Sequence, residues 1–239
     1  MTIASDCLKN HLLTALSEDA RRRIFPKLKR VEMPLGEVIY ESGQTIEYVY
    51  FPIDCIISLL YVMIDGASAE ISVVGNEGMA GVAVIMGGES TPSRSVVQSR
   101  GYAYRMAASE MKTEFNNYSE IRILTLQFTQ ALITQMSQTA VCNRHHSIDQ
   151  QLCRWLLLSL DRLEGNRLNM TQELIANMLG VRREGVTQAA GKLQKLGVID
   201  YQRGQITVLD LPRLEALSCE CYAAVKYETS RLDVKALKF

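Results

Sequence analysis

The stretch MTQELIANMLGVRREGVTQAAGKLQKLGVI, residues 170–199, decides how the fold of this sequence is interpreted. Leu174, Ile175 and Met178 recur at helical spacing, and Gly180 then interrupts the pattern. A second apolar set follows at the same spacing and consists of Val186, Ala189, Ala190, Leu193 and Leu196. The stretch therefore predicts a helix, a tight turn and a second helix.

The polar residues of the second helix fall on the side opposite its apolar set. Arg183 and Thr187 are one turn apart, and so are Glu184 and Gln188. An arginine can bind guanine through two hydrogen bonds, a glutamate can accept from the cytosine amino group, and a glutamine can pair with adenine. We therefore predict that this helix reads bases in the major groove, the alternative being a solvated charged face. Gly185 permits close approach of DNA or of a neighbouring helix, or is merely tolerated at a cost of about 1 kcal/mol relative to alanine.

These residues resemble the winged helix-turn-helix of the Crp/Fnr bacterial transcription regulators, whose motif runs roughly T-x-x-x-I-A-x-x-L-G-x-[ST]-R-E-x-[VI]-[ST]-R. The resemblance implies that Arg183 and Glu184 read bases and that Thr171 contacts a phosphate. It also implies that Arg203 is a cation at the tip of the wing. Double-stranded DNA, a second copy of the chain and RNA polymerase are the partners that such a regulator would have.

The sequence departs from the family pattern at two positions. Gln188 stands where the family usually has a second arginine, and Arg182 stands where it usually has serine or threonine. The base preference of the half-site is therefore left open, whereas the docking mode is expected to be that of the family. The predicted DNA-contacting residues are Thr171, Arg182, Arg183, Glu184, Thr187, Gln188 and Arg203.

Upstream of this motif the chain changes from strand-like to helical. Over residues 31–106, short β-branched and aromatic runs alternate with turn signals, which predicts an antiparallel barrel or sandwich with a tight two-residue hairpin turn at Asp65-Gly66. Residues 119–144 lack Gly and Pro and predict one long helix, after which Ser147 can cap another. Near the end of the motif, Arg203-Gly204 predicts a second hairpin.

The expected architecture is α+β. We predict a β-roll sensor domain over residues 1–118, a dimerisation helix over 119–146, and a winged helix-turn-helix domain with a C-terminal helical extension over 147–239. The long helix has two apolar stripes, one with Leu124, Phe128, Ala131 and Leu132 and the other with Leu126, Ile133 and Ala140. The β-roll can cover one stripe and a second copy of the helix the other, which predicts a homodimer. The alternative is a helix buried wholly within one subunit.

Composition is compatible with a DNA-binding protein despite a formal net charge of zero. No Lys or Arg occurs over residues 31–93, whereas residues 182–205 contain five basic and two acidic residues. DNA responds to such a local basic surface rather than to the total charge. The apolar run at residues 55–64 is shorter than the ~20 residues that cross a bilayer. Because the chain start also lacks a signal-peptide pattern, we expect a cytoplasmic protein without a membrane partner.

The β-roll contains a degenerate form of the cassette that binds cyclic nucleotides in relatives, where a G-E-L element precedes R-S-A. Gly81, Arg94 and Ser95 fit this cassette, but Val82 replaces the ribose-binding glutamate. A valine cannot accept a hydrogen bond from a ribose hydroxyl. We therefore name Gly81, Val82, Arg94 and Ser95 as candidate effector residues and do not expect cyclic AMP to be the signal. Another small ligand, no ligand, or a haem or iron–sulfur group are the alternatives.

The cysteines and histidines offer little chemistry when they are considered in sequence alone. The six cysteines are Cys7, Cys55, Cys142, Cys153, Cys219 and Cys221. They include no CxxC pair and no tight set of zinc or cluster ligands, so we expect reduced thiols and no metal, with only the Cys219/Cys221 pair inviting a metal or redox interpretation.

Two alternatives to a regulator are an enzyme and an architectural DNA-binding protein. The three histidines, His11, His145 and His146, lie outside the predicted barrel, which argues against a cupin-like metalloenzyme. We therefore predict no catalytic residues and no enzymatic activity. An unregulated architectural protein, which would bend or coat DNA with little site preference, remains the other alternative.

Overall fold

The N-terminal part of the chain is a β-roll, as seen in a computed structural model that describes residues 6–232. One antiparallel sheet has the order β1-β7-β3, with bounds Lys29–Met33, Gly101–Ala107 and Tyr48–Pro52. The other has the order β2-β6-β4-β5, with bounds Val38–Tyr40, Arg94–Ser99, Ile56–Val62 and Ser68–Val74. The short helices around the sheets are α2 (His11–Thr14), α3 (Glu18–Ile24), η1 (Phe25–Lys27), η2 (Val82–Val84) and α4 (Ala108–Asn117).

The hairpin between β4 and β5 lies where the sequence predicts it, but its turn is longer than the predicted two residues. The Met63 N–H donates to Ala67 O, and the Gly66 N–H donates to Met63 O. Gly66 has a φ of 86°, whereas Asp65 does not adopt a positive φ. The connection is therefore a three-residue loop with glycine in the left-handed position rather than a turn with two positive φ angles.

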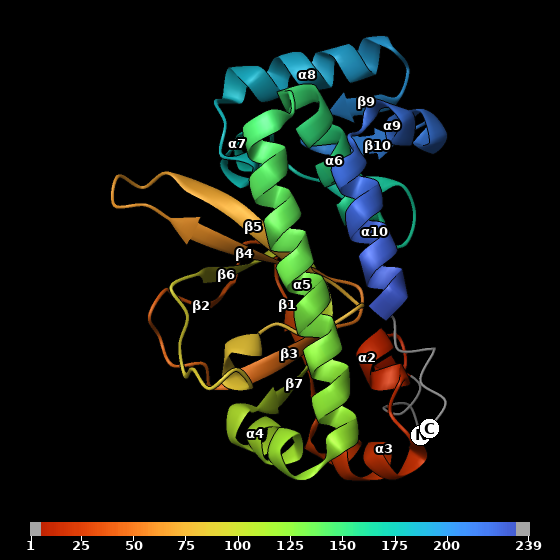
Figure 1. Cartoon of the computed structure of the whole chain (residues 1–239). Helices are drawn as coiled ribbons and strands as arrows, with labels where there is room; N and C mark the ends of the chain where they lie inside the picture. The colour runs from red at the N-terminus through yellow and green to blue at the C-terminus, as the bar shows by residue number, and fades with distance from the viewer. Residues whose placement is uncertain (1–5, 233–239) are drawn as a thin grey trace.

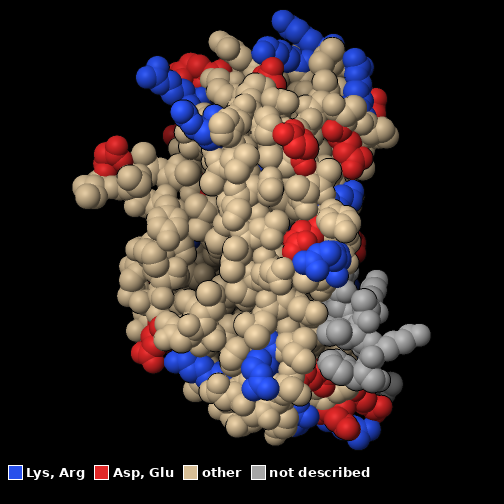
Figure 2. Space-filling view, in the orientation of Figure 1, with Lys and Arg blue, Asp and Glu red and all other residues tan. Residues whose placement is uncertain are grey.

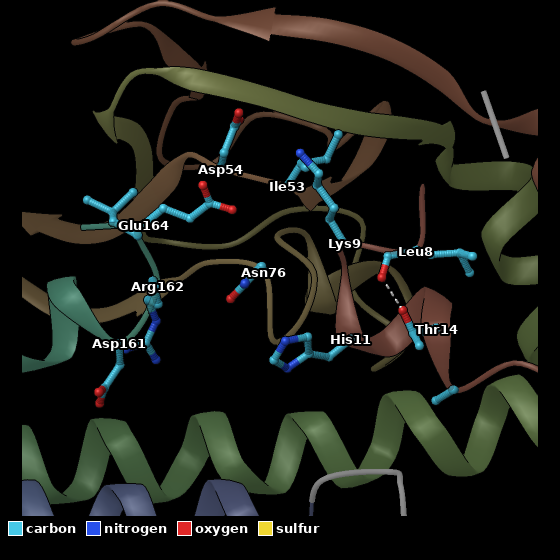
Figure 3. Close-up of a pocket in the computed structure, with 12 residues that line it drawn as sticks. Leu8, Lys9, His11, Thr14, Ile53, Asp54, Asn76, Asp161, Arg162 and Glu164 are labelled. Carbon is cyan, nitrogen blue, oxygen red and sulfur yellow. Dashed lines mark hydrogen bonds between the residues drawn. The ribbon is translucent and has the colours of Figure 1, made fainter. Parts of the chain in front are cut away.

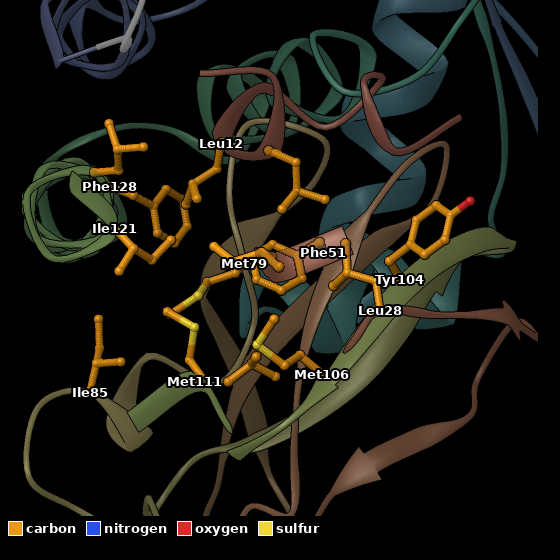
Figure 4. Packing of buried hydrophobic residues seen from close by; sticks show 14 of the residues in the cluster. Leu12, Leu28, Phe51, Met79, Ile85, Tyr104, Met106, Met111, Ile121 and Phe128 are labelled. Atoms are coloured by element: carbon orange, nitrogen blue, oxygen red, sulfur yellow. The ribbon is translucent and has the colours of Figure 1, made fainter. Parts of the chain in front are cut away.

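A long helix, α5 (Ser119–His145), connects the β-roll to the rest of the molecule and confirms the predicted helix (Figure 1). Its buried side chains join the β-roll core, where Phe128 and Ile121 approach Met79 and Phe51 (Figure 4). A Cβ atom at Gly78 would lie 1.8 Å from the Phe128 ring, so a glycine is required for this close packing. The helix is thereby fixed to the β-roll along one side.

The C-terminal part contains a winged helix-turn-helix and an additional helix. Its elements are α6 (Ile148–Leu160), β8 (Arg167–Asn169), α7 (Gln172–Leu179), α8 (Arg183–Lys195), β9 (Ile199–Gln202), β10 (Gln205–Val208), α9 (Leu211–Leu217) and α10 (Glu220–Leu232). Ser147 caps α6 as predicted and forms a capping box with Gln150. The sequence analysis did not anticipate β8, which pairs with β10, or the position of α10 beside α5 (Figure 1).

Buried polar contacts connect one face of α6 to the β-roll. The Trp155 Nε1–H donates to Glu70 Oε1 at 3.0 Å, and the amide of Gln98 donates to Ser159 Oγ at 3.1 Å. At the end of the helix, the Arg162 Nε–H donates to Glu77 Oε1 at 2.7 Å. Trp155 and Ser159 are one helical turn apart and lie on the same side of α6, and Arg162 follows just beyond its C-cap, Asp161.

The protonation state of Glu70 affects these contacts. Burial raises the pKa of its carboxyl to about 7, although hydrogen bonds with Ser58 and Trp155 act in the opposite direction. The single hydroxyl proton of Ser58 faces acceptor oxygens of both Glu70 and Gln98. Protonated Glu70 resolves this conflict, because it donates to Ser58 and leaves the Ser58 proton for Gln98.

Replacing Glu70 with glutamine is expected to change how stability depends on pH. The folded-state pKa of Glu70 lies above the unfolded value, so its contribution is fully present at low pH and is lost as pH rises through about 7. Between about pH 5 and about pH 8, the wild type should lose ~2–3 kcal/mol more free energy of unfolding than Glu70→Gln. Urea unfolding at several pH values measures this difference. If the free energy of unfolding depends on pH in the same way for both proteins, the prediction is wrong.

Candidate nucleic-acid interface

The helix-turn-helix is built by local interactions that the sequence motif encodes. Thr171 caps α7, because its hydroxyl accepts from the Leu174 N–H at 3.2 Å. Gly180 ends α7 with a φ of 65°, in the left-handed region that glycine adopts readily. A Cβ atom at Gly185 would lie 2.7 Å from Ile148 Cδ1. Of the explanations considered for Gly185, this contact favours close packing against a neighbouring helix.

The polar face of α8 is open to solvent. Its exposed residues include Arg182, Arg183, Glu184, Thr187 and Gln188. The Thr187 hydroxyl is engaged locally, where it lies 2.7 Å from Gln172 Oε1 and 3.0 Å from Arg183 O. Thr187 therefore links α8 to α7. The structure brings together the five side chains of this helix that were predicted from the sequence, on the surface opposite the buried Val186 and Leu193.

The wing places Arg203 beside the first helix of the motif. Arg203 and Gly204 have φ angles of 50° and 79°, as the predicted tight turn between β9 and β10 requires. The Met170 N–H donates to Gly204 O at 2.6 Å, and the Tyr201 hydroxyl donates to Met170 O at 2.7 Å. These bonds hold the exposed wing tip next to Thr171, the cap of α7.

Basic side chains gather at the end of the molecule formed by α8 (Figure 2). Arg182, Arg183 and Lys195 are exposed there, and Lys192 forms an ion pair with Asp149 at 2.8 Å. Acidic side chains are interspersed among them, so the surface is locally basic without being uniformly charged (Figure 2). This distribution agrees with the charge asymmetry seen in the sequence and suits contact with a phosphate backbone.

The candidate effector residues of the β-roll differ in their surroundings. Gly81 has a φ of 99° and precedes η2, where Val82 packs partly against the β-roll core. Arg94 forms an ion pair with Glu41 at 3.0 Å, and Ser95 is buried. A cyclic phosphate at Arg94 would therefore have to compete with the Glu41 carboxylate.

A separate cavity of about 590 Å³ lies between the N-terminal arm, the β-roll and the end of α6 (Figure 3). Its lining includes Lys9 and His11 of the arm, Asp54 and Asn76 of the β-roll, and Glu164 beyond α6. None of the four candidate effector residues lines this cavity. No sequence pattern indicated it, because its walls come from four separate segments of the chain.

The structure corrects the interpretation that the cysteines supply no tight ligand set. Cys142, Cys219 and Cys221 form a buried cluster, and His146 adjoins them. His146 was noted only as lying outside the barrel. These residues are far apart in sequence and come together because α10 folds back along α5.

The fold and the α8 surface define a winged helix-turn-helix protein. Residues 150–217 match the family described as the Crp-like helix-turn-helix domain. A comparison with curated protein sequences finds no match. Within residues 6–232, no helix is both long and apolar enough to span a membrane.

Solved structures of several regulators share the fold of the whole chain. A protein described as a transcriptional regulator of the Crp/Fnr family from Eubacterium rectale has a TM-score of 0.68 at 20% identity, over 86% of this chain and 96% of that one. FixK2 from Bradyrhizobium japonicum has a TM-score of 0.67 at 16% identity, over 80% and 98%. A CRP-family transcriptional regulator from Thermus thermophilus has a TM-score of 0.66 at 16% identity, over 80% and 96%.

The match over residues 150–217 makes this segment a Crp-like helix-turn-helix domain, and the chain has the fold of Crp/Fnr regulators. The comparisons therefore show a helix-turn-helix domain of the Crp-like family within a chain that shares its overall fold with solved Crp/Fnr regulators.

Proposed function

We propose that this protein is a homodimeric regulator that binds palindromic DNA sites through α8. The observation that carries the proposal is the exposed α8 face, on which Arg183, Glu184 and Gln188 stand free of the core. In this arrangement α8 enters the major groove while Thr171 and Arg203 contact the phosphate backbone. The proposed site of action is the cytoplasm, with RNA polymerase as a further partner. No catalytic role is proposed for any residue.

The exposed side of α5 supports the dimer. Leu126 and Ile133 are 48% and 51% exposed, and Ala140 is exposed too. These three residues are seven positions apart, which is the repeat of a coiled-coil seam. The β-roll covers another side of α5, and α10 lies along a third, where Gln130 donates to Glu228 at 3.2 Å. A second α5 therefore fits the side that this chain leaves open.

A charge placed on this seam is expected to dissociate the dimer. Ile133→Glu would bring two carboxylates together at a twofold interface, where burying unpaired charges is unfavourable. Light scattering at micromolar concentration should report a dimer for the wild type and a monomer for the variant. Leu209→Glu is the matched control, because Leu209 is also an exposed apolar residue but lies beyond β10. A monomeric wild type, with and without DNA, would contradict the proposal.

Selection of bound DNA from random sequence tests the mode of DNA recognition. A twofold dimer should select a palindrome with half-site centres ~10–10.5 base pairs apart. Arg183→Ala should flatten the preference for guanine at one position of each half-site, a loss of ~1–3 kcal/mol of discrimination, and Glu184→Ala should do so for cytosine. Gln188 should give a relaxed or adenine-preferring position.

A substitution in the wing supplies the control for this experiment. Arg203→Asn removes the cation but retains a residue that tolerates the observed φ of 50°. Its affinity should fall equally for all sequences, and the salt dependence should decrease by roughly one unit for each lost contact. If no palindrome is selected, or if Arg183→Ala weakens all sequences equally, the protein is an architectural DNA binder instead.

We also propose that a signal other than cyclic AMP modulates the protein through the β-roll. The absence of a carboxylate at Val82 and the pairing of Arg94 with Glu41 support this proposal. Calorimetry of the purified protein with cyclic AMP is therefore expected to show no binding heat. Tight binding would refute the assignment of Val82 to the ribose position.

A further inference from the structure

Four potential metal ligands meet where the end of α5 touches the start of α10. Cys142 lies in the last turn of α5, and His146 is the residue that ends this helix. Cys219 precedes α10, and Cys221 lies in its first turn. The three thiols are buried, and the His146 side chain is 13% exposed. The site is thus closed by the protein on nearly all sides.

The distances within this cluster agree with a tetrahedral centre. Cys142 Sγ lies 3.6 Å from Cys219 Sγ, and Cys221 Sγ lies 3.6 Å from His146 Nδ1. Zinc bonds of about 2.3 Å to sulfur and about 2.05 Å to nitrogen imply tetrahedral edges of about 3.8 Å and about 3.5 Å. All four ligand atoms lie within 4.8 Å of one another. A closure of about 1 Å at the widest pair therefore completes the tetrahedron.

The surroundings of the cluster provide an outer-shell partner for the imidazole. His146 Nε2 lies 3.3 Å from Glu220 Oε2. With Nδ1 directed at the cluster, the neutral imidazole has its hydrogen on Nε2, and this N–H can donate a hydrogen bond to the Glu220 carboxylate. Histidine ligands in metal sites are typically oriented by such a hydrogen bond from their second nitrogen.

A buried arginine also suits a negatively charged centre. Arg154 is 6% exposed, and its guanidinium donates to Thr139 at 2.8 Å. Arg154 is close enough to both Cys142 and Glu70 to interact with them electrostatically. A divalent ion with three thiolates and one neutral imidazole has a net charge of −1, which a buried cation nearby would compensate.

We propose that Cys142, His146, Cys219 and Cys221 bind one Zn²⁺ ion in a structural site. Three sulfur ligands and one nitrogen ligand in a closed tetrahedral arrangement are characteristic of structural zinc. The ion fastens α10 to the end of α5, and through His146 it fixes the junction with α6, because Ser147 caps that helix. The four ligands are distinct from the α8 residues that are proposed to contact DNA.

Metal analysis of the full-length protein tests this proposal. The wild type, purified without chelator, should contain one zinc per chain by plasma mass spectrometry, and Cys219→Ala/Cys221→Ala should contain none. Cys55→Ala is the matched control, because Cys55 is also buried but belongs to a different cluster within the β-roll. Equal zinc content in the wild type and the double variant would overturn the proposal.

A second experiment uses the wild type alone and does not depend on the folding of a variant. After removal of zinc with a chelator, titration with Co²⁺ should give the intense visible bands of tetrahedral cobalt and a thiolate charge-transfer band, both saturating at one ion per chain. Cobalt spectra of an octahedral ion, or spectra without a thiolate band, would refute the site. As a further check, Glu220→Ala retains all four ligands but should weaken zinc binding ~10–100-fold, as loss of an outer-shell partner does.

Hydrogen exchange tests whether the ion holds α10 against the end of α5. Removal of zinc from the wild type should accelerate amide exchange in α10 and leave the β1-β7-β3 sheet unchanged. Unchanged exchange in α10 would refute the structural role. The competing explanation for the close thiols is a redox pair: a disulfide between Cys142 and Cys219, found by mass spectrometry in protein that retains no metal, would replace the zinc proposal.

Discussion

The position of α8 depends on the buried polar contacts of α6 and the residues that follow it. Trp155 and Ser159 on one side of α6, and Arg162 just beyond its end, each contact a polar side chain of the β-roll. Apolar surfaces can slide over one another at small cost, whereas a buried polar group that loses its partner costs about 1–3 kcal/mol. The contacts therefore favour one orientation of α6, and α8 packs against α6 through Gly185 and Ile148.

The same face of α6 gives a physical route between the two halves of the molecule. Glu70 belongs to β5 and contacts Trp155, so its ionisation would place a charge directly in the interface. Arg162 contacts Glu77 and also lines the cavity beside the N-terminal arm. A Cβ atom at Gly75 would lie 2.7 Å from Arg162 Cγ, so the arginine is tightly enclosed. Changes in either region would alter contacts that orient α6.

Helix α5 has three distinct sides: two are covered by other parts of this chain, and one is exposed. The β-roll covers a side rich in large apolar residues such as Phe128, which fits over Gly78. At its C-terminal end, Cys142 and His146 meet the cysteines that begin α10. The remaining side has the heptad positions Leu126, Ile133 and Ala140. The mixture of Gln, Thr and apolar residues along α5 is explained by these separate surroundings.

The sequence by itself determined the local features of the protein. Thr171 through its capping hydroxyl, and Gly180 and Gly204 through their left-handed backbone, encode the helix-turn-helix and wing, and the absence of Gly and Pro over residues 119–144 encodes α5. The number of turn residues predicted at Asp65-Gly66 was wrong, because glycine alone adopts the left-handed conformation there.

Only the tertiary structure decided which distant residues meet. The return of α10 along α5 brings together four ligands spread over 80 residues of chain, from 142 to 221, and packing against α6 brings Glu70 to Trp155. No local propensity specifies such pairs, because their proximity arises from the simultaneous burial of several elements.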